Sequence, residues 1–69
     1  MDQFKKQELE NEYLGQTIRI IHMEGEPEYT NAVGKVEYID DIGQLHGTWG
    51  GLAIDLVCDK VQILEDYYI

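Results

Sequence analysis

Beyond Gln16 the apolar residues alternate with polar ones in short runs, and Gly, Pro or Asp interrupts the chain after each run. Between residues 17 and 22, for example, Ile18 and Ile20 flank Arg19. Successive side chains of a β-strand point to opposite faces, so a period of two is typical of a strand with one buried face. The pattern therefore predicts that most of the chain forms short strands joined by turns.

Five runs of this kind predict five strands. They cover residues 17–22, 34–40, 44–49, 52–56 and 60–64. A long polar loop follows the first run, tight turns join the next three, and one 3₁₀ turn at residues 57–59 precedes the last. A chain of 69 residues covers the edges of so many short strands best by curling into a partly closed barrel. We therefore predict a mainly β fold, a small five-stranded SH3-like barrel with a short N-terminal α-helix.

The helix is predicted ahead of the strands, at residues 2–14. Asp2 can cap its first turn, and Gly15 can end it because glycine tolerates a left-handed backbone. Leu9 and Tyr13 are four residues apart and share a face, which favours a helix that covers a sheet edge over a partner-binding arm. The predicted organisation is a helical arm at residues 1–15, the barrel at 16–64 and a C-terminal tail at 65–69.

The charge of the chain argues against two kinds of partner. It has 14 acidic residues against 5 lysines and arginines, a formal net charge of −9. Binding to phosphates or to an anionic membrane surface requires clustered cations. The basic residues are instead scattered along the sequence, at Lys5, Lys6, Arg19, Lys35 and Lys60. We therefore expect no direct contact with nucleic acid and no membrane binding.

The single cysteine bears on location. Cys58 has no second cysteine with which to form an internal disulfide, and small secreted domains usually depend on disulfides. No run approaches the roughly 18 apolar residues of a membrane span. The N-terminal residues lead into a charged segment rather than the apolar stretch of a signal peptide. We therefore expect a cytoplasmic protein.

Metal-ligating side chains alternate along the loop after the first predicted strand. They are His22, Glu24, Glu26 and Glu28, which His46 or Cys58 could join. No pair has the close spacing typical of a metal motif, and carboxylates in a surface loop usually face water. We therefore predict no metal site and no bound cofactor.

The sequence offers little support for catalysis. Without a serine there is no serine nucleophile. Cys58 and a histidine could form a nucleophile and base, but Asp55 and Asp59 are close in sequence, and nearby carboxylates raise the pKa of a thiol. Asp40 and Asp41 stand in a predicted hairpin turn, where such residues are usually solvated turn formers. We therefore predict no catalytic residues and a protein that is not an enzyme.

Aromatic residues near loop ends, with carboxylates around them, predict a surface that binds another protein. In SH3-like barrels such aromatics form grooves for peptides. The predicted partner-binding residues are Tyr29, Trp49, Glu24, Glu26, Glu28, Asp40 and Asp41. Their charge favours a basic partner. In the alternative interpretation Trp49 caps the core, because a lone Trp in a small domain is usually a core residue. Tyr29 then packs its loop against the rest of the domain.

Six short pieces of the sequence carry a resemblance to a known family. They are IRIIHM at 18–23, PEYT at 27–30, GKV at 34–36, IDDIGQLH at 39–46, WGGLA at 49–53 and DKV at 59–61. In order and spacing they resemble the bacterial domain-of-unknown-function family 4314, over residues 18–64. The turn at residues 50–51 is shorter than the family's, and residues 32–34 replace its Pro-Gly. The resemblance implies a bacterial or phage source and a mobile element, and it implies no activity.

Two functions fit these observations. The first is a non-enzymatic protein-interaction module that binds a basic protein. The alternative is an acidic mimic of nucleic acid that inhibits a DNA-binding enzyme, as an anti-defence protein would. A barrel that binds nucleic acid directly fits the net charge least well. The sequence leaves the identity of the partner and the oligomeric state open.

Overall fold

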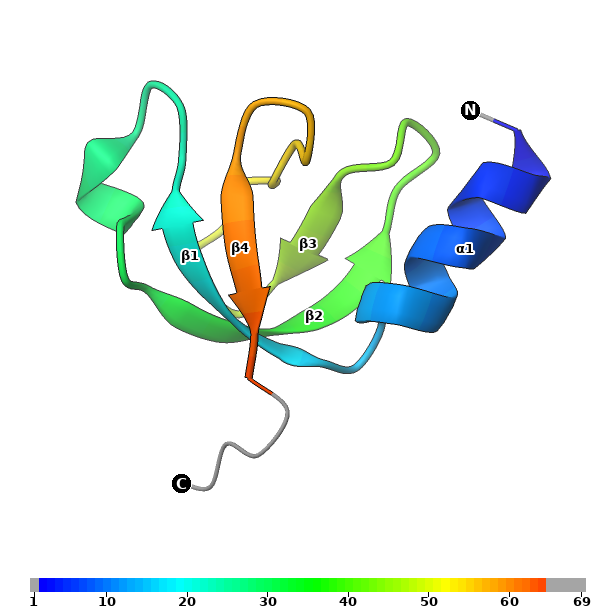
Figure 1. Ribbon diagram of the computed structural model, residues 1–69, viewed down its shortest axis with the longest axis horizontal. Coiled ribbons are helices and arrows are strands. Elements are labelled where there is room, and N and C mark those ends of the chain that lie inside the picture. The colour runs from blue at the N-terminus through cyan, green and yellow to red at the C-terminus, as the bar shows by residue number, and fades with distance from the viewer. Residues whose placement is uncertain (1, 65–69) are drawn as a thin grey trace.

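The computed structural model describes residues 2–64, and the predicted tail at residues 65–69 lies outside this part (Figure 1). Its elements are α1 (Gln3–Tyr13), β1 (Thr17–His22), the 3₁₀ helix η1 (Pro27–Tyr29), β2 (Val33–Ile39), β3 (Leu45–Gly47) and β4 (Lys60–Ile63). The strands form one antiparallel sheet in the order β3-β2-β1-β4. Three connecting loops gather at one end of the molecule, opposite the long curved strand β2 (Figure 1).

The central strand β1 determines where the core lies. Ile18 and Ile20 are fully buried, whereas Arg19 between them is exposed. Ile18 stands opposite Gly34 of β2 on one side and opposite Ile63 of β4 on the other. The alternation predicted for this strand is confirmed, and its inward face becomes the floor of the core.

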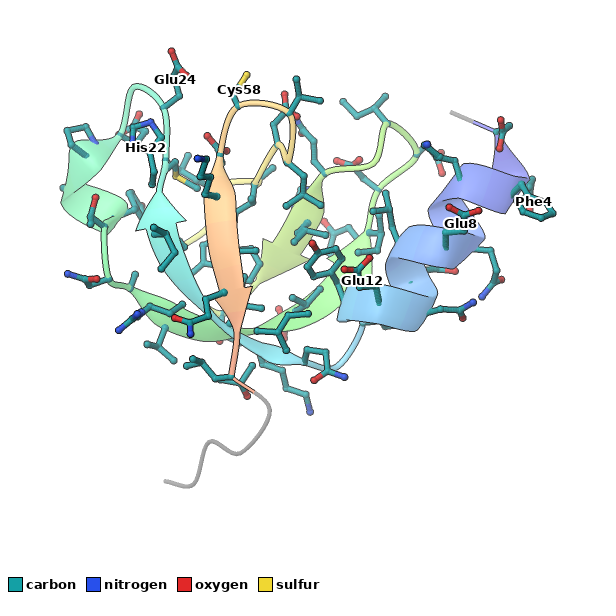
Figure 2. All side chains as sticks on the ribbon, in the orientation of Figure 1. Phe4, Glu8, Glu12, His22, Glu24 and Cys58 are labelled. Carbon is teal, nitrogen blue, oxygen red and sulfur yellow. The ribbon has the colours of Figure 1, made fainter. Side chains whose placement is uncertain are left out.

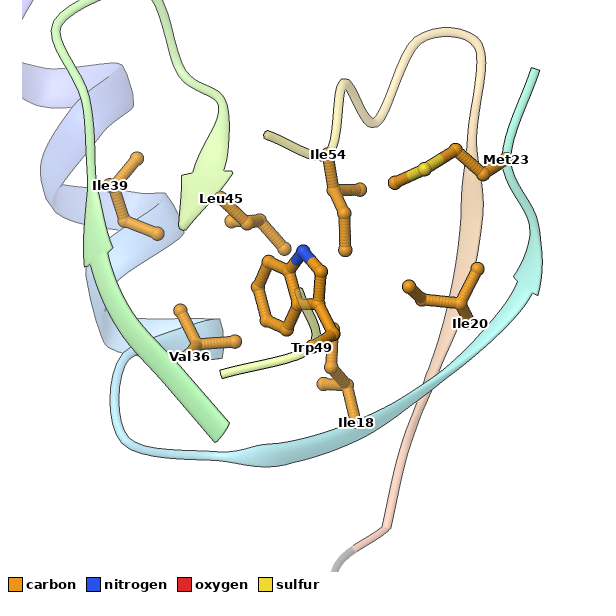
Figure 3. Packing of buried hydrophobic residues seen from close by; sticks show 8 residues of the cluster. All are labelled: Ile18, Ile20, Met23, Val36, Ile39, Leu45, Trp49 and Ile54. Atoms are coloured by element: carbon orange, nitrogen blue, oxygen red, sulfur yellow. The ribbon is translucent and has the colours of Figure 1, made fainter. Parts of the chain in front are cut away.

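Trp49 occupies the middle of the core, where its ring is 6% exposed (Figure 3). Its indole Nε1 donates a hydrogen bond to the Leu52 carbonyl at 2.6 Å, so the one polar atom of the ring is satisfied. The buried cluster consists of Ile18, Ile20, Met23, Val36, Ile39, Leu45, Trp49 and Ile54. The interpretation of Trp49 as a core residue is therefore the one that the structure supports.

The prediction of a five-stranded barrel is wrong, because the sheet has four strands and does not close. Residues 52–56, predicted as a strand, contribute only an isolated bridge between Ile54 and Leu45. The run predicted at 44–49 is shortened to β3. The 3₁₀ helix η1 lies in the loop after β1. Before β4, where one 3₁₀ turn was predicted at residues 57–59, the Asp55 carbonyl accepts from the N–H groups of Cys58 and Asp59, which makes a single turn and not a separate helix.

Hydrogen bonds to side chains explain why residues 52–56 do not extend into a strand. The Leu52 carbonyl accepts from Trp49 Nε1, and the Asp55 N–H donates to Asp59 Oδ2 at 2.9 Å. A backbone group that is satisfied in this way is not available to a neighbouring strand. Only the N–H and carbonyl of Ile54, which both pair with Leu45, remain in a ladder.

The predicted N-terminal helix is confirmed as α1. Asp2 Oδ1 accepts a hydrogen bond from the Lys5 N–H at 2.8 Å, and Gly15 follows the helix with a φ of 81°. Leu9 and Tyr13 pack against the core cluster. The helix therefore docks beside β2 and covers that end of the sheet (Figure 1).

Gly47 of β3 provides a test of the packing around Trp49. A Cβ at this position would overlap the Lys35 carbonyl oxygen and the Trp49 ring. Because overpacking forces the backbone apart, we expect Gly47→Ala to lower the free energy of unfolding by about 2–3 kcal/mol, measured by urea denaturation. Gly51→Ala is the control, since its Cβ would meet nothing within 4 Å.

The control carries a different cost. Gly51 has a φ of 97°, and an alanine there costs about 1 kcal/mol through backbone strain alone. Equal losses in the two variants would mean that β3 does not pack against the ring as described.

Candidate functional site

Two loops meet beyond the end of β1 and the start of β4, and one buried carboxylate holds them together. Asp59 is 8% exposed. Its Oδ1 accepts a hydrogen bond from the Glu24 N–H at 2.8 Å, and its Oδ2 accepts one from the Asp55 N–H at 2.9 Å. Asp55 Oδ1 in turn accepts from the Val57 N–H at 3.0 Å. The backbones of the two loops are thereby tied to each other.

We call the outer part of this arrangement the loop-tip surface; it consists of the exposed Glu24, Val57 and Cys58 and the half-buried Asp55. Val57 is 92% exposed, the largest exposure among the large apolar side chains in the described part of the chain. Figure 2 shows Glu24 and Cys58 pointing the same way from neighbouring loop tips. An apolar side chain and a free thiol therefore stand among carboxylates.

The pKa of Cys58 reflects the negative charges around it. Its pKa is raised above the ordinary value of 9.0, first by the charge of Asp55, then by partial desolvation and by the charges of Glu24 and Asp59. The prediction that neighbouring aspartates raise the pKa of this thiol is confirmed. The sequence does not reveal the contribution of Glu24, which is 34 positions away in the chain.

The rest of the loop after β1 is organised by its own contacts. The carboxyl groups of Glu26 and Glu28 lie close enough to interact, and this interaction raises the pKa of Glu26 and lowers that of Glu28. The Tyr29 hydroxyl makes a long hydrogen bond, 3.4 Å, to the Gly50 carbonyl, and its ring packs against the core. Tyr29 thus anchors η1, and Trp49 is buried, so neither predicted aromatic forms an open groove.

The predicted site residues Asp40 and Asp41 lie in a different place, the turn between β2 and β3. Asp40 Oδ1 accepts from the backbone N–H of Gln44 at 2.9 Å and of Ile42 at 3.1 Å. Its Oδ2 lies 2.7 Å from His46 Nε2. These hydrogen bonds, with that of His46 the strongest, lower the pKa of Asp40. Asp40 therefore closes the turn.

Two further contacts tie this turn to its surroundings. The Tyr38 ring stacks on His46 with centroids 4.4 Å apart. Asp41 forms an exposed ion pair with Lys6 of α1 at 3.0 Å. Neither aspartate joins the loop-tip surface, so the predicted acidic ring is divided between two places.

Three residues of this arrangement were not placed in the site from the sequence: Asp55, Val57 and Asp59. Their contact with Glu24 spans 35 positions, from Asp59 Oδ1 to the Glu24 N–H. The one signal of this arrangement in the sequence is the pair Asp55 and Asp59, which stand on either side of a short turn. Of the predicted residues, Glu24 belongs to the loop-tip surface.

Residues 2–64 contain no group of three metal-ligating side chains close enough to hold an ion. An open hollow of about 530 Å³ lies between α1 and the β2–β3 turn. Its charged residues include Lys6 and Asp41, which already pair with each other. Its other carboxylates are Asp2, which caps α1 through the Lys5 N–H, and Glu10.

No family model, curated protein or solved structure matches the chain. The resemblance to family 4314 therefore stays a prediction. None of the helices within residues 2–64 has the length and apolar character needed to cross a bilayer.

Removing the Asp59 carboxylate tests its role in joining the loops. Asp59→Ala leaves the N–H groups of Glu24 and Asp55 without their acceptor, and an unsatisfied buried donor costs about 1–3 kcal/mol. We expect the free energy of unfolding to fall by about 2 kcal/mol, with faster amide hydrogen exchange at both residues. The control is Asp41→Ala, which removes an exposed ion pair that contributes little to stability. A loss no larger than the control's would contradict this role.

The reactivity of the Cys58 thiol provides a second test, which concerns the negative electrostatic potential at the loop-tip surface. The thiolate is the reactive form, and nearby carboxylates keep its fraction low. Asp55→Asn keeps the acceptor for the Val57 N–H but removes the charge that raises the pKa of Cys58 most. We expect iodoacetamide to alkylate this variant roughly two- to fivefold faster than the wild type at pH 8. Glu8→Gln, on α1 (Figure 2), should leave the rate unchanged; equal acceleration there would refute a local effect.

Proposed function

We propose that this chain is a small, non-enzymatic protein-interaction module that binds a basic protein through the loop-tip surface. One observation carries the proposal: Glu24 and Asp55 converge beside an exposed Val57 on two loops that Asp59 holds together. Carboxylates attract and orient a basic partner. An apolar side chain that is 92% exposed gains free energy when the partner covers it.

The chemistry of the surface supports binding better than catalysis. Three of its four residues are exposed to solvent, whereas catalytic groups work in pockets that exclude water. The raised pKa of Cys58 makes this thiol a poor nucleophile near neutral pH. Fixed loops with little to reorganise also lose less conformational entropy when a partner docks.

The proposal includes a setting for the protein. A cytoplasmic location agrees with Cys58, an exposed free thiol that a reducing compartment preserves. The resemblance to family 4314 favours a bacterial or phage mobile element. The alternative function, a mimic of nucleic acid that inhibits a DNA-binding enzyme, rests on the net charge of −9 alone.

Affinity capture with matched baits tests the function. The baits are the wild type, a loop-tip variant (Glu24→Gln with Asp55→Asn) and a control (Glu8→Gln with Glu37→Gln). Both variants change the net charge by the same amount, and the control residues are exposed on α1 and β2. We expect quantitative mass spectrometry of a bacterial lysate to find a basic protein retained by the wild type and the control. Its retention should fall at least about fivefold on the loop-tip variant.

The outcome separates the proposal from its alternative. Addition of a 20-base-pair DNA duplex should leave the captured protein bound. Release by the duplex would indicate a nucleic-acid mimic instead. A capture profile that does not differ between the two variants would overturn the assignment of the loop-tip surface.

A further inference from the structure

We propose that the outward face of the sheet is a second docking surface, which binds an acidic segment of a partner protein that also carries apolar side chains. This surface lies on the side of β2, β1 and β4 opposite the core. We call it the outer sheet face; its residues are Arg19, Ile21, Val33, Lys35, Lys60 and Gln62, all exposed. It shares no residue with the loop-tip surface.

Strand register brings the first cations together. Arg19 stands opposite Val33 of β2 and opposite Gln62 of β4. Its guanidinium donates to Gln62 Oε1 at 2.8 Å, which uses one of its five donors and fixes its position. Lys35 stands opposite Thr17, two residues from Arg19 along β1. Diagonal neighbours in a sheet lie about 7–8 Å apart, so Arg19 and Lys35 present adjacent positive charges.

Lys60 extends this basic row on β4. It pairs with His22 across the bulge that follows Ile20 in β1, and both Lys60 and His22 are exposed. Three of the five lysines and arginines therefore share one face, although they are scattered in the sequence. Neither β1 nor β4 contains an acidic residue, and exposed Glu37, two positions after Lys35 on β2, is the one carboxylate on these three strands. With three cations and one carboxylate, the outer sheet face is locally positive in a chain whose net charge is −9.

Two apolar side chains decide which polyanion fits. Ile21 and Val33 are 40% and 38% exposed, and Val33 stands directly beside Arg19. A nucleic-acid backbone would leave them uncovered, and the six residues of the face include no aromatic ring on which a base could stack. The overall negative charge also repels a long polyanion. A protein segment with both carboxylates and apolar side chains satisfies the cations and covers the isoleucine and valine together.

An NMR titration of the full-length, isotope-labelled chain tests this inference with three peptides. The first is a 14-residue helix-forming peptide of Ala, Glu and Leu, with Leu along one face and Glu beside it. The second replaces each of its Glu residues by Gln, and the third replaces each Leu by Ala. We expect the first peptide to shift the amide signals of Arg19 and Gln62, and the other two to bind at least about threefold more weakly.

Paired variants locate the binding. Lys35→Gln with Lys60→Gln should weaken binding of the first peptide at least about threefold. Two lysines are changed together because each exposed ion pair contributes only modestly. The control, Lys5→Gln with Lys6→Gln on α1, changes the charge equally and should alter the affinity less than about 1.5-fold. The loop-tip variant Glu24→Gln with Asp55→Asn should bind the peptide unchanged, so a failure here leaves the proposed function separately testable.

Several results would overturn the inference. They are equal weakening by the two lysine double variants, amide shifts confined to the loops, or no shift at about 1 mM peptide. Tighter binding of a 14-base-pair DNA duplex than of the first peptide on the same amides would make this face a nucleic-acid surface.

Discussion

The register of the central strand β1 is the constraint on which the rest of the structure depends. Ile18 and Ile20 face the core and Arg19 faces out, and a slip of one residue would reverse all three. Burying an isoleucine contributes about 1.5–3 kcal/mol, whereas burying an unpaired guanidinium costs considerably more. Both effects favour the same register. Because β2 and β4 pair directly with β1, that register also determines which of their side chains face the core and which face solvent.

Where strand pairing ends, side chains form hydrogen bonds with backbone N–H and carbonyl groups that have no partner strand. Trp49 binds the Leu52 carbonyl, Asp59 binds two backbone N–H groups, and Asp40 closes the β2–β3 turn in the same way. These contacts leave the sheet open but keep its loops in place. The loops at this end are therefore positioned by a few defined hydrogen bonds, which suits a surface that must present carboxylates without a rigid ladder beneath it.

The parts of the structure that follow from local signals could be predicted, and those that follow from distant contacts could not. The alternation in β1, the Asp2 cap and the stop at Gly15 each depend on residues within a few positions. Residues 52–56 alternate as a strand does, but the Leu52 carbonyl is bound by Trp49 and the Asp55 N–H by Asp59. Similarly, the sequence singled out Glu24 as a site residue, but the contact with Asp59 that fixes its loop spans 35 positions.

The distribution of charge in the fold cannot be read from composition. Basic residues that are scattered along the sequence meet on one face because antiparallel pairing aligns β2, β1 and β4. The acidic residues at the loop-tip surface stand on loops at the end of the sheet. Charges act mainly within a Debye length, about 8 Å at physiological ionic strength, so each surface is governed by its own side chains when a partner docks. Net charge then controls the approach of a partner from a distance, and the local pattern controls which surface it occupies. The basic partner proposed for the loop-tip surface and the acidic one proposed for the outer sheet face are therefore compatible with one chain whose net charge is −9.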